Sequence, residues 1–325
     1  MKTFLKYFIS FGLGGGLLWY VYRDIDSASL IKQLQAANIY WVIACIITAF
    51  FAHWARAMRW RMLLGPLGKT PAVSTSFYAV MSGYAINMAV TRLGEVSRCA
   101  ILTKEEDIPI ENNMGTVLAE RLMDLLFMVA VILLTLWVEK DTVINFISAR
   151  LNAPAKVNAD TGINYYQIGF LAILIIGTIL YFTKKELFTK VYNGIINFFK
   201  GLLSGILSFK NVKNIPLFIF YSSLIWVMYY GGTLCLFKAF TQTSVFGLDV
   251  ILVIFTMGSL GMILPSPGGV GTFHTFVTEG LIIFGMTHIQ AAPFAAVAHG
   301  IQSIGILILW VLSWIAFIAF KKKGN

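Results

Sequence analysis

Long apolar stretches, separated by shorter polar segments, run through most of the chain. Several approach the length of about 20 residues that an α-helix needs to cross the hydrocarbon core of a bilayer. They predict membrane helices at residues 5–22, 39–57, 116–138, 163–183, 215–237 and 292–320.

Two further apolar segments are interrupted. Residues 71–91 are long enough to span a bilayer but contain several serines, a glycine and Asn87. Residues 247–286 are broken by the sequence Pro265-Ser-Pro-Gly-Gly-Val-Gly271. Residues 186–210 alternate lysines with Phe, Ile and Leu, which is typical of a helix lying in the membrane interface.

Composition supports a membrane protein. Hydrophobic residues make up 58% of the chain and charged residues only 12%, whereas soluble domains carry about 25% charged residues. The net charge of +10 comes mainly from residues between the apolar runs, so it indicates topology and anionic head groups more than nucleic acid. The three cysteines are widely separated and predict neither a disulfide framework nor a metal site.

Basic loops predict the orientation. The loop 184–213 carries six lysines and one glutamate, and the chain ends in a run of lysines, so both should be cytoplasmic. Counting crossings then places both chain termini in the cytoplasm of a plasma (inner) membrane protein. It also makes 71–98 a re-entrant segment from the inside and 247–286 one from the outside, although two short full spans would satisfy the second count equally. The expected fold is all-α, one domain over 1–325, with about 6–8 transmembrane helices. Interrupted segments in both halves are compatible with two inverted structural halves and favour a transporter substrate site.

The most unusual polar group follows the first interrupted segment. Arg92, Glu95 and Arg98 are spaced three apart, so a helix would place them near one face, with Glu95 fixing two arginines. Planar guanidinium groups suit phosphate. The pattern therefore predicts a clamp for a phosphate or lipid head group. The alternative is an ordinary cytoplasmic loop with a local ion pair.

A second charged group opens the helix predicted at 116–138. Glu120 and Asp124 are four residues apart and share a face. Charges inside a membrane helix usually face the bundle interior. These two could pair with Arg59, Arg92 or Arg98, or carry protons. Alternatively, this first turn still lies at the interface.

The Pro-Gly break offers a different chemistry. Its prolines remove backbone donors, and its glycines permit unusual dihedral angles, so freed amides could bind an anion. Close helix packing is the alternative role for the glycines. His274 and Glu279 follow, and His274 could simply be a hydrogen-bonded interior histidine.

Three stretches resemble the flippase-like membrane domain of bacterial lysylphosphatidylglycerol synthases and of stand-alone relatives. They are Arg56 to Leu64, then Gly83 to Arg98 with Glu120-Arg121-x-x-Asp124, and Pro265 to Gly271. Two positions depart from the family pattern. Val90 stands where a proline is usual, and Phe273-His274 stands where Arg-Glu is frequent.

The resemblance implies movement of a lipid between leaflets, with a site between the two re-entrant regions. The site residues that the motifs and the polar pattern together predict are Arg59, Asn87, Arg92, Gly94, Glu95, Arg98, Glu120, Arg121, Asp124, Pro265, Pro267, Gly268, Gly269, Gly271, His274 and Glu279.

The leading hypothesis is a flippase or carrier for a phospholipid or polyprenyl-phosphate lipid, without a cofactor or metal. Because the chain ends soon after its last apolar segment, it is expected to lack the soluble aminoacyl-transferring domain and to work beside a separate lipid-modifying enzyme. One alternative is a polyprenyl-phosphate glycosyltransferase, or the membrane subunit of a lipid-modifying enzyme, using Asp24 and Asp26. Another is a non-transporting scaffold. The resemblance favours a transporter over an enzyme.

Overall fold

The computed structural model describes residues 33–68, 70–142, 212–264 and 266–321, with the single residues 19 and 31. Internal contacts divide the chain into one unit of Met1–Val138 with Phe209–Asn325 and a second unit of Glu139–Ser208. The second unit lies almost wholly outside the described residues, and the description below concerns the first. The spans predicted at 5–22 and 163–183 and the interfacial helix at 186–210 also lie outside them.

Four long helices have the length and apolar composition to cross a membrane. They are α3 (Ile39–Leu64), α6 (Ile110–Val138), α10 (Ile215–Ala239) and α13 (His288–Lys321). Each contains one of the predicted spans, and all four expose large apolar side chains. The described residues form no strand. The protein is therefore an all-α polytopic membrane protein, as its hydrophobic pattern predicts.

The first interrupted segment folds as a helical hairpin of α4 (Val73–Ala89) and α5 (Leu93–Glu106). The Ala72 amide donates to the Glu106 carboxylate at 3.1 Å, which shows that the arms are antiparallel. Near the tip, Gly94 lies so close to the Gly83 carbonyl that any added side chain would collide with it. The second arm thus runs to Glu106, beyond the predicted limit at residue 98.

The second interrupted segment also folds as a hairpin. Its arms are α11 (Leu248–Ile263) and α12 (Thr272–Ile283), joined by a turn with a short 3-10 helix, η3 (Pro267–Gly269). A Cβ added at Gly261 would lie 2.9 Å from the Cα of Phe273, so the glycine permits close approach of the two arms. The arms contain 16 and 12 residues, which is short for a full crossing that takes about 20.

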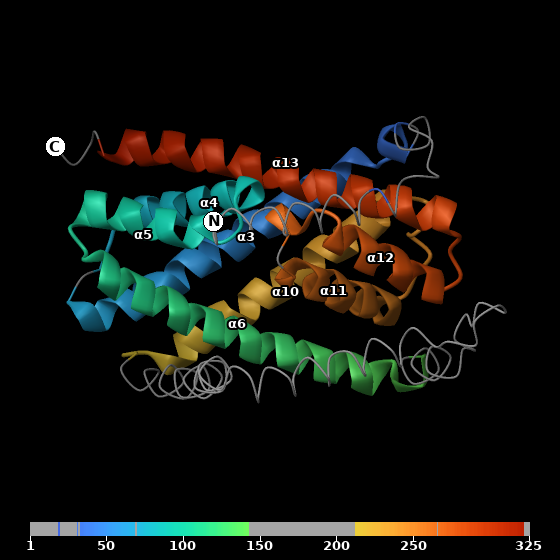
Figure 1. Ribbon diagram of the computed structural model, residues 1–325, viewed down its shortest axis with the longest axis horizontal. Coiled ribbons are helices and arrows are strands. Elements are labelled where there is room, and N and C mark those ends of the chain that lie inside the picture. The colour runs from blue at the N-terminus through green and yellow to red at the C-terminus, as the bar shows by residue number, and fades with distance from the viewer. Residues whose placement is uncertain are drawn as a thin grey trace, which may run out of the picture. The chain divides into compact units, whose positions relative to one another are not determined.

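The two hairpins enter the helix bundle from opposite ends (Figure 1). The open end of α4 and α5 lies beside the end of α13, where Lys321 pairs with Glu105. The open end of α11 and α12 lies beside the other end of the bundle, where the Tyr230 hydroxyl on α10 donates to the Leu248 carbonyl at 2.8 Å. This opposite entry agrees with the predicted crossings, whereas the re-entrant position in a bilayer stays a prediction.

The tips of the hairpins meet. A Cβ built on Gly268 would lie 3.2 Å from the Cα of Met88, so the turn after α11 is in contact with the last turn of α4. Both interruptions of the hydrophobic pattern therefore come into contact, through residues that are half-buried.

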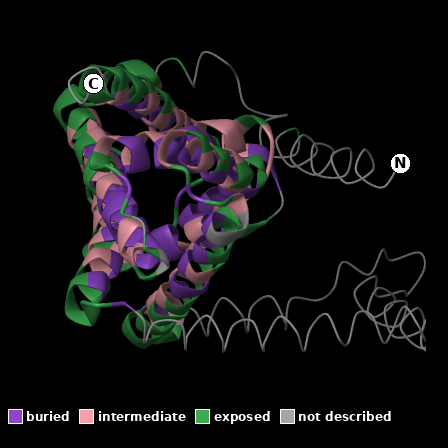
Figure 2. Ribbon diagram, turned by 90° about the vertical axis from the view of Figure 1, so that its left-hand side faces the viewer, coloured by how far each residue is buried: buried purple, intermediate pink, exposed green. Residues whose placement is uncertain are grey.

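Buried apolar side chains form two larger clusters and a small third one that includes Leu63 and Phe218. The buried residues lie mainly on the parts of the helices nearest the inside of the bundle (Figure 2). One of the larger clusters joins α10, α11, α12 and the first half of α13 around Phe237 and Phe294. The other joins α3, α4 and α5 around Trp60, and α3 continues beyond it into the short 3-10 helix η1 (Gly65–Leu67). The polar residues described next lie beside this second cluster.

Candidate functional site

Five charged side chains meet in the interior, and we call them the charge cluster: Arg56 and Arg59 from α3, Arg98 from α5, and Glu120 and Asp124 from α6. Glu120 and Arg59 have no exposed surface. Charges this deep need partners, because an unpaired buried charge is strongly destabilising. Glu120 therefore lies in the interior of the described fold, while its depth in a bilayer stays a prediction.

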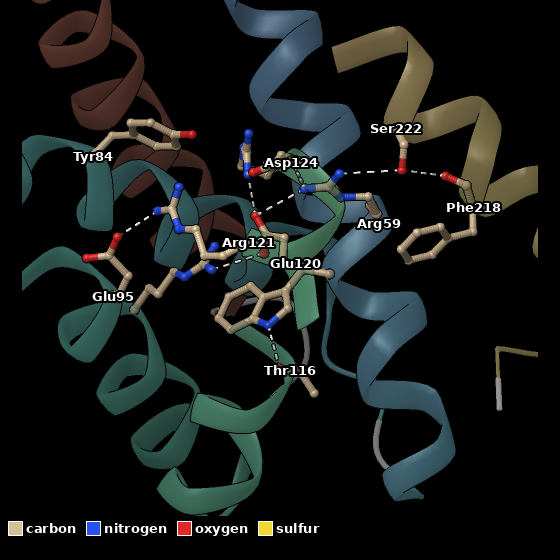
Figure 3. A network of polar contacts seen from close by, with 12 residues as sticks. Arg59, Tyr84, Glu95, Thr116, Glu120, Arg121, Asp124, Phe218 and Ser222 are labelled. Carbon is tan, nitrogen blue, oxygen red and sulfur yellow. Dashed lines mark hydrogen bonds and ion pairs between the residues drawn. The ribbon is translucent and has the colours of Figure 1, made fainter. Parts of the chain in front are cut away.

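Helical spacing brings the partners together (Figure 3). Arg56 and Arg59 are three residues apart on α3, and Glu120 and Asp124 are four apart on α6, so each pair shares one face of its helix. Arg56 Nη1 lies 2.5 Å from Glu120 Oε1 and 2.7 Å from Asp124 Oδ2. Arg59 Nη2 lies 2.7 Å from Asp124 Oδ1.

Arg98 reaches the same carboxylate from the first hairpin. Its Nη2 lies 3.0 Å from Glu120 Oε2, at ion-pair distance but without hydrogen-bond geometry. Its guanidinium carbon lies 4.6 Å from the centre of the Trp60 ring. Trp60 is held in place by a hydrogen bond of 2.9 Å from its Nε1 to Thr116. A single carboxylate on α6 thus ties the hairpin to the long helices.

The charge cluster has an excess of positive charge. Three arginines face two carboxylates, which gives 3 − 2 = +1. Within the described part of the chain, the Nε atoms of Arg56, Arg59 and Arg98, and Nη2 of Arg98, are buried without a hydrogen-bond acceptor. Buried guanidinium donors with surplus charge favour an anionic ligand, and phosphate or carboxylate oxygens are the acceptors that match them.

Aromatic and hydroxyl groups border the cluster on the side of α4 and α10. The Tyr229 hydroxyl lies 3.4 Å from Arg56 Nη2 and 3.2 Å from the Tyr84 hydroxyl. The ring of Tyr84 packs against His53, with centroids 4.4 Å apart. Ser222 on α10 lies 3.4 Å from Arg59 Nη1. These groups give the site further polar contacts from two more helices.

The prediction that Glu95 pairs with Arg92 and Arg98 is wrong. Arg92 precedes α5 in a left-handed conformation, with φ of 66°, and is exposed, so it does not share the helical face of the other two. Glu95 pairs with Arg121 at 2.7 Å, and Asn87 caps the Gly94 amide at 2.8 Å. Among the described residues, Arg92 forms no ion pair.

Most backbone amides in the turn of the second hairpin already donate hydrogen bonds within the protein. The Gly269 and Val270 amides donate to the Ser266 and Pro267 carbonyls at 3.2 and 3.0 Å, and the Gly271 amide donates to His274. The expectation that these amides are free for an anion is therefore wrong for all three. Gly268, Gly269 and Gly271 have positive φ, and Gly269 also packs against Met262, which agrees with the close-packing alternative.

Other predicted positions lie apart from the charge cluster. His274 is a hydrogen-bonded interior histidine, with its Nε2 3.0 Å from Nδ1 of His299. Glu279 lies on α12, which supplies no side chain to the cluster. Pro265, Asp24 and Asp26 lie outside the described residues. Within the described ranges, no three His, Cys, Asp or Glu side chains gather as a metal site would require.

Sequence reasoning did not include Arg56, Tyr229 or His299 among the site residues. The signal for Arg56 was its spacing of three residues from Arg59 within an apolar helix. Tyr229 and His299 carry no such signal, because a tyrosine or histidine in an apolar run is common.

The fold defines an all-α polytopic membrane protein with a buried cluster of ion pairs. The chain belongs to the family described as the lysylphosphatidylglycerol synthase TM region, whose model matches residues 7–309. Comparison with curated proteins and with solved structures gives no match.

Proposed function

We propose that the protein binds the phosphate group of a membrane lipid at the charge cluster and moves that lipid between leaflets. The observation that carries the proposal is the surplus charge of +1, together with buried Nε donors on three arginines. A lipid phosphate carries the complementary charge and accepts several hydrogen bonds. Lysine would supply only a point charge, whereas arginine supplies the fork that phosphate geometry matches.

The two hairpins support movement, and not only binding. They enter from opposite ends and touch at Gly268 and Met88. A contact of this kind could separate the cluster from one side of the bilayer and open toward the other. Broken helices in corresponding halves are a frequent feature of transporter substrate sites. The family is a membrane domain of lipid-modifying enzymes by its description, which agrees with a lipid ligand.

Arg98 provides the sharpest test, because among the described residues two of its nitrogens have no acceptor and its only ion pair is with Glu120. Arg98→Gln removes the surplus charge and leaves two arginines with two carboxylates, so the fold should tolerate it. We expect about a 10- to 100-fold loss of phospholipid binding, which corresponds to one charge-assisted hydrogen bond of about 1.5–3 kcal/mol. Native mass spectrometry of co-purified lipid and fluorescent-lipid translocation in vesicles of anionic phospholipid are the measurements.

Arg61→Gln is the matched control. Arg61 lies on α3 two residues after Arg59, but its Nε donates to the Pro71 carbonyl at 2.7 Å, and it lies outside the charge cluster. It should keep lipid occupancy and the translocation rate. Equal occupancy and equal rates in wild type, Arg98→Gln and Arg61→Gln would contradict the proposed site. An occupied site with no translocation in any variant would favour the scaffold over the transporter.

A further inference from the structure

Two buried histidines connect the ends of the glycine-rich turn. His299 on α13 lies with Nε2 2.9 Å from the Gly268 carbonyl oxygen and Nδ1 3.0 Å from His274 Nε2. His274 on α12 accepts a hydrogen bond of 3.3 Å from the Gly271 amide at Nδ1. The result is a continuous chain from one end of the turn through two imidazole rings to the other.

The directions of these bonds fix both tautomers. A carbonyl oxygen can only accept, so His299 Nε2 carries a proton, and in the neutral ring its Nδ1 is then an acceptor. His274 Nε2 must therefore donate to it, which leaves His274 Nδ1 to accept from the Gly271 amide. Three bonds agree with one another only when both rings are neutral.

An added proton cannot be accommodated without breaking the chain. All four ring nitrogens are engaged, two as donors and two as acceptors. A proton on His299 Nδ1 would set two N–H groups against each other, and a proton on His274 Nδ1 would face the Gly271 amide. Rearrangement of the rings then releases the Gly268 carbonyl or the Gly271 amide.

We infer that His274 and His299 form a proton-binding site that holds the turn of the second hairpin in contact with the first and releases it when a proton binds. Gly268, the residue held by His299, is the same residue that touches Met88 at the tip of α4. The bound proton would therefore promote separation of the hairpin tips. In a transporter this couples lipid movement to proton concentration, so this consequence rests on the proposed function.

Among the described residues, few other titratable groups lie on the neighbouring helices. Asp249 and His288 are at the starts of α11 and α13, many residues from the turn. Glu279 shares α12 with His274 and follows it by five residues. Tyr84 on α4 packs against His53 on α3, beside Arg56, and Tyr78 on α4 stacks on Phe317, far along α13 from His299.

Nitrogen-15 NMR of histidine in the full-length protein tests the site directly. The chain has only four histidines, and single substitutions assign their signals. We expect His274 and His299 to be Nε2–H tautomers at neutral pH and to change together on acidification. A proton on Nδ1 of either neutral ring, or signals that change independently, would overturn the inference whether or not lipid moves.

Matched variants test the coupling. The double variant His274→Gln/His299→Gln keeps an N–H donor and an oxygen acceptor at each position but cannot bind the proton. His299→Phe removes the donor to Gly268 and leaves a ring of similar size stacked on Phe273. His288→Gln is the control on the same helix, and Glu279→Gln separates the effect of the nearby carboxylate.

In vesicles, translocation by wild type and His288→Gln should rise up to about tenfold for each pH unit of acidification while the protonated form is a minority. The double glutamine variant should be slow and independent of pH, and His299→Phe should be fast at every pH. Wild-type translocation that is independent of pH, with both rings neutral by NMR, would overturn the coupling and leave lipid transport intact. No translocation in any protein would refute transport, while the NMR experiment would still decide the proton site.

Discussion

Arg56 and Glu120 are 64 positions apart in the chain and form a buried ion pair with an N–O distance of 2.5 Å. The pair joins α3 to α6, and Arg98 extends it to the first hairpin through the other oxygen of the same carboxylate. One carboxylate therefore connects three helices through ion pairs.

Glu120→Gln should destabilise the protein strongly. It leaves three buried arginines with one carboxylate, and removing one member of a buried ion pair typically costs about 3–5 kcal/mol. Glu105→Gln is the control, because its partner Lys321 is more than half exposed and such pairs contribute about 0–1 kcal/mol. Denaturant unfolding in detergent measures both. A similar small loss in the two variants would show that the charge cluster does not stabilise the fold.

The hydrophobic pattern predicted the long helices because a bilayer-spanning helix needs a continuous apolar run, and that property is local. It also predicted that both interrupted segments would leave and return on one side. The antiparallel arms of α4 and α5, and of α11 and α12, agree with this geometry. The extent of the first hairpin was harder to predict, because the polar residues 93–106 resemble a cytoplasmic loop when the residues they pair with are unknown.

Pairing in the charge cluster depends on contacts between distant segments. The spacing predicted that Glu95 pairs with Arg92 and Arg98. In the structure the backbone at Arg92 is left-handed, and α6 lies close enough that Glu95 pairs with Arg121 and Arg98 pairs with Glu120. Residue types therefore indicated several of the charged side chains that pair, but Arg56 was not among them and Arg92 was included wrongly. Only the packing of α3, α5 and α6 decided which ones meet.

Gly94→Ala should disrupt the first hairpin. The added methyl group would collide with the Gly83 carbonyl, which belongs to helix backbone and cannot rotate away. Overpacking of this kind costs about 1–3 kcal/mol. Gly115→Ala is the control, because no atom lies within 4 Å of its Cβ position, and Ala in a helix is about 0.5–1 kcal/mol more favourable than Gly. Opposite shifts in thermal stability are expected, and equal shifts would refute the close contact.

Arg92→Ala separates lipid contact from folding. Arg92 is exposed and adopts a positive φ. Alanine at this position has the same backbone strain, so the free energy of unfolding should change by about 0.5 kcal/mol or less. If Arg92 guides a phosphate toward the charge cluster, translocation falls while stability does not. Lys104→Ala, an exposed cation further along α5, should leave the rate unchanged. A wild-type rate in Arg92→Ala would remove Arg92 from the site.

Gly268→Ala tests the contact between the two hairpins. Gly268 and Gly285 both have positive φ, 58° and 89°, so alanine at either position strains the backbone by roughly 1–2 kcal/mol. They differ in their surroundings, because nothing lies within 4 Å of a Cβ at Gly285, whereas a Cβ at Gly268 meets the Met88 backbone at 3.2 Å. Both variants should lose similar stability from strain, but only Gly268→Ala should push the tips apart and change the translocation rate. Shortening Met88 should not rescue it, since the nearest atom is Cα. Identical transport in the two alanine variants would mean that contact between the tips does not control lipid movement.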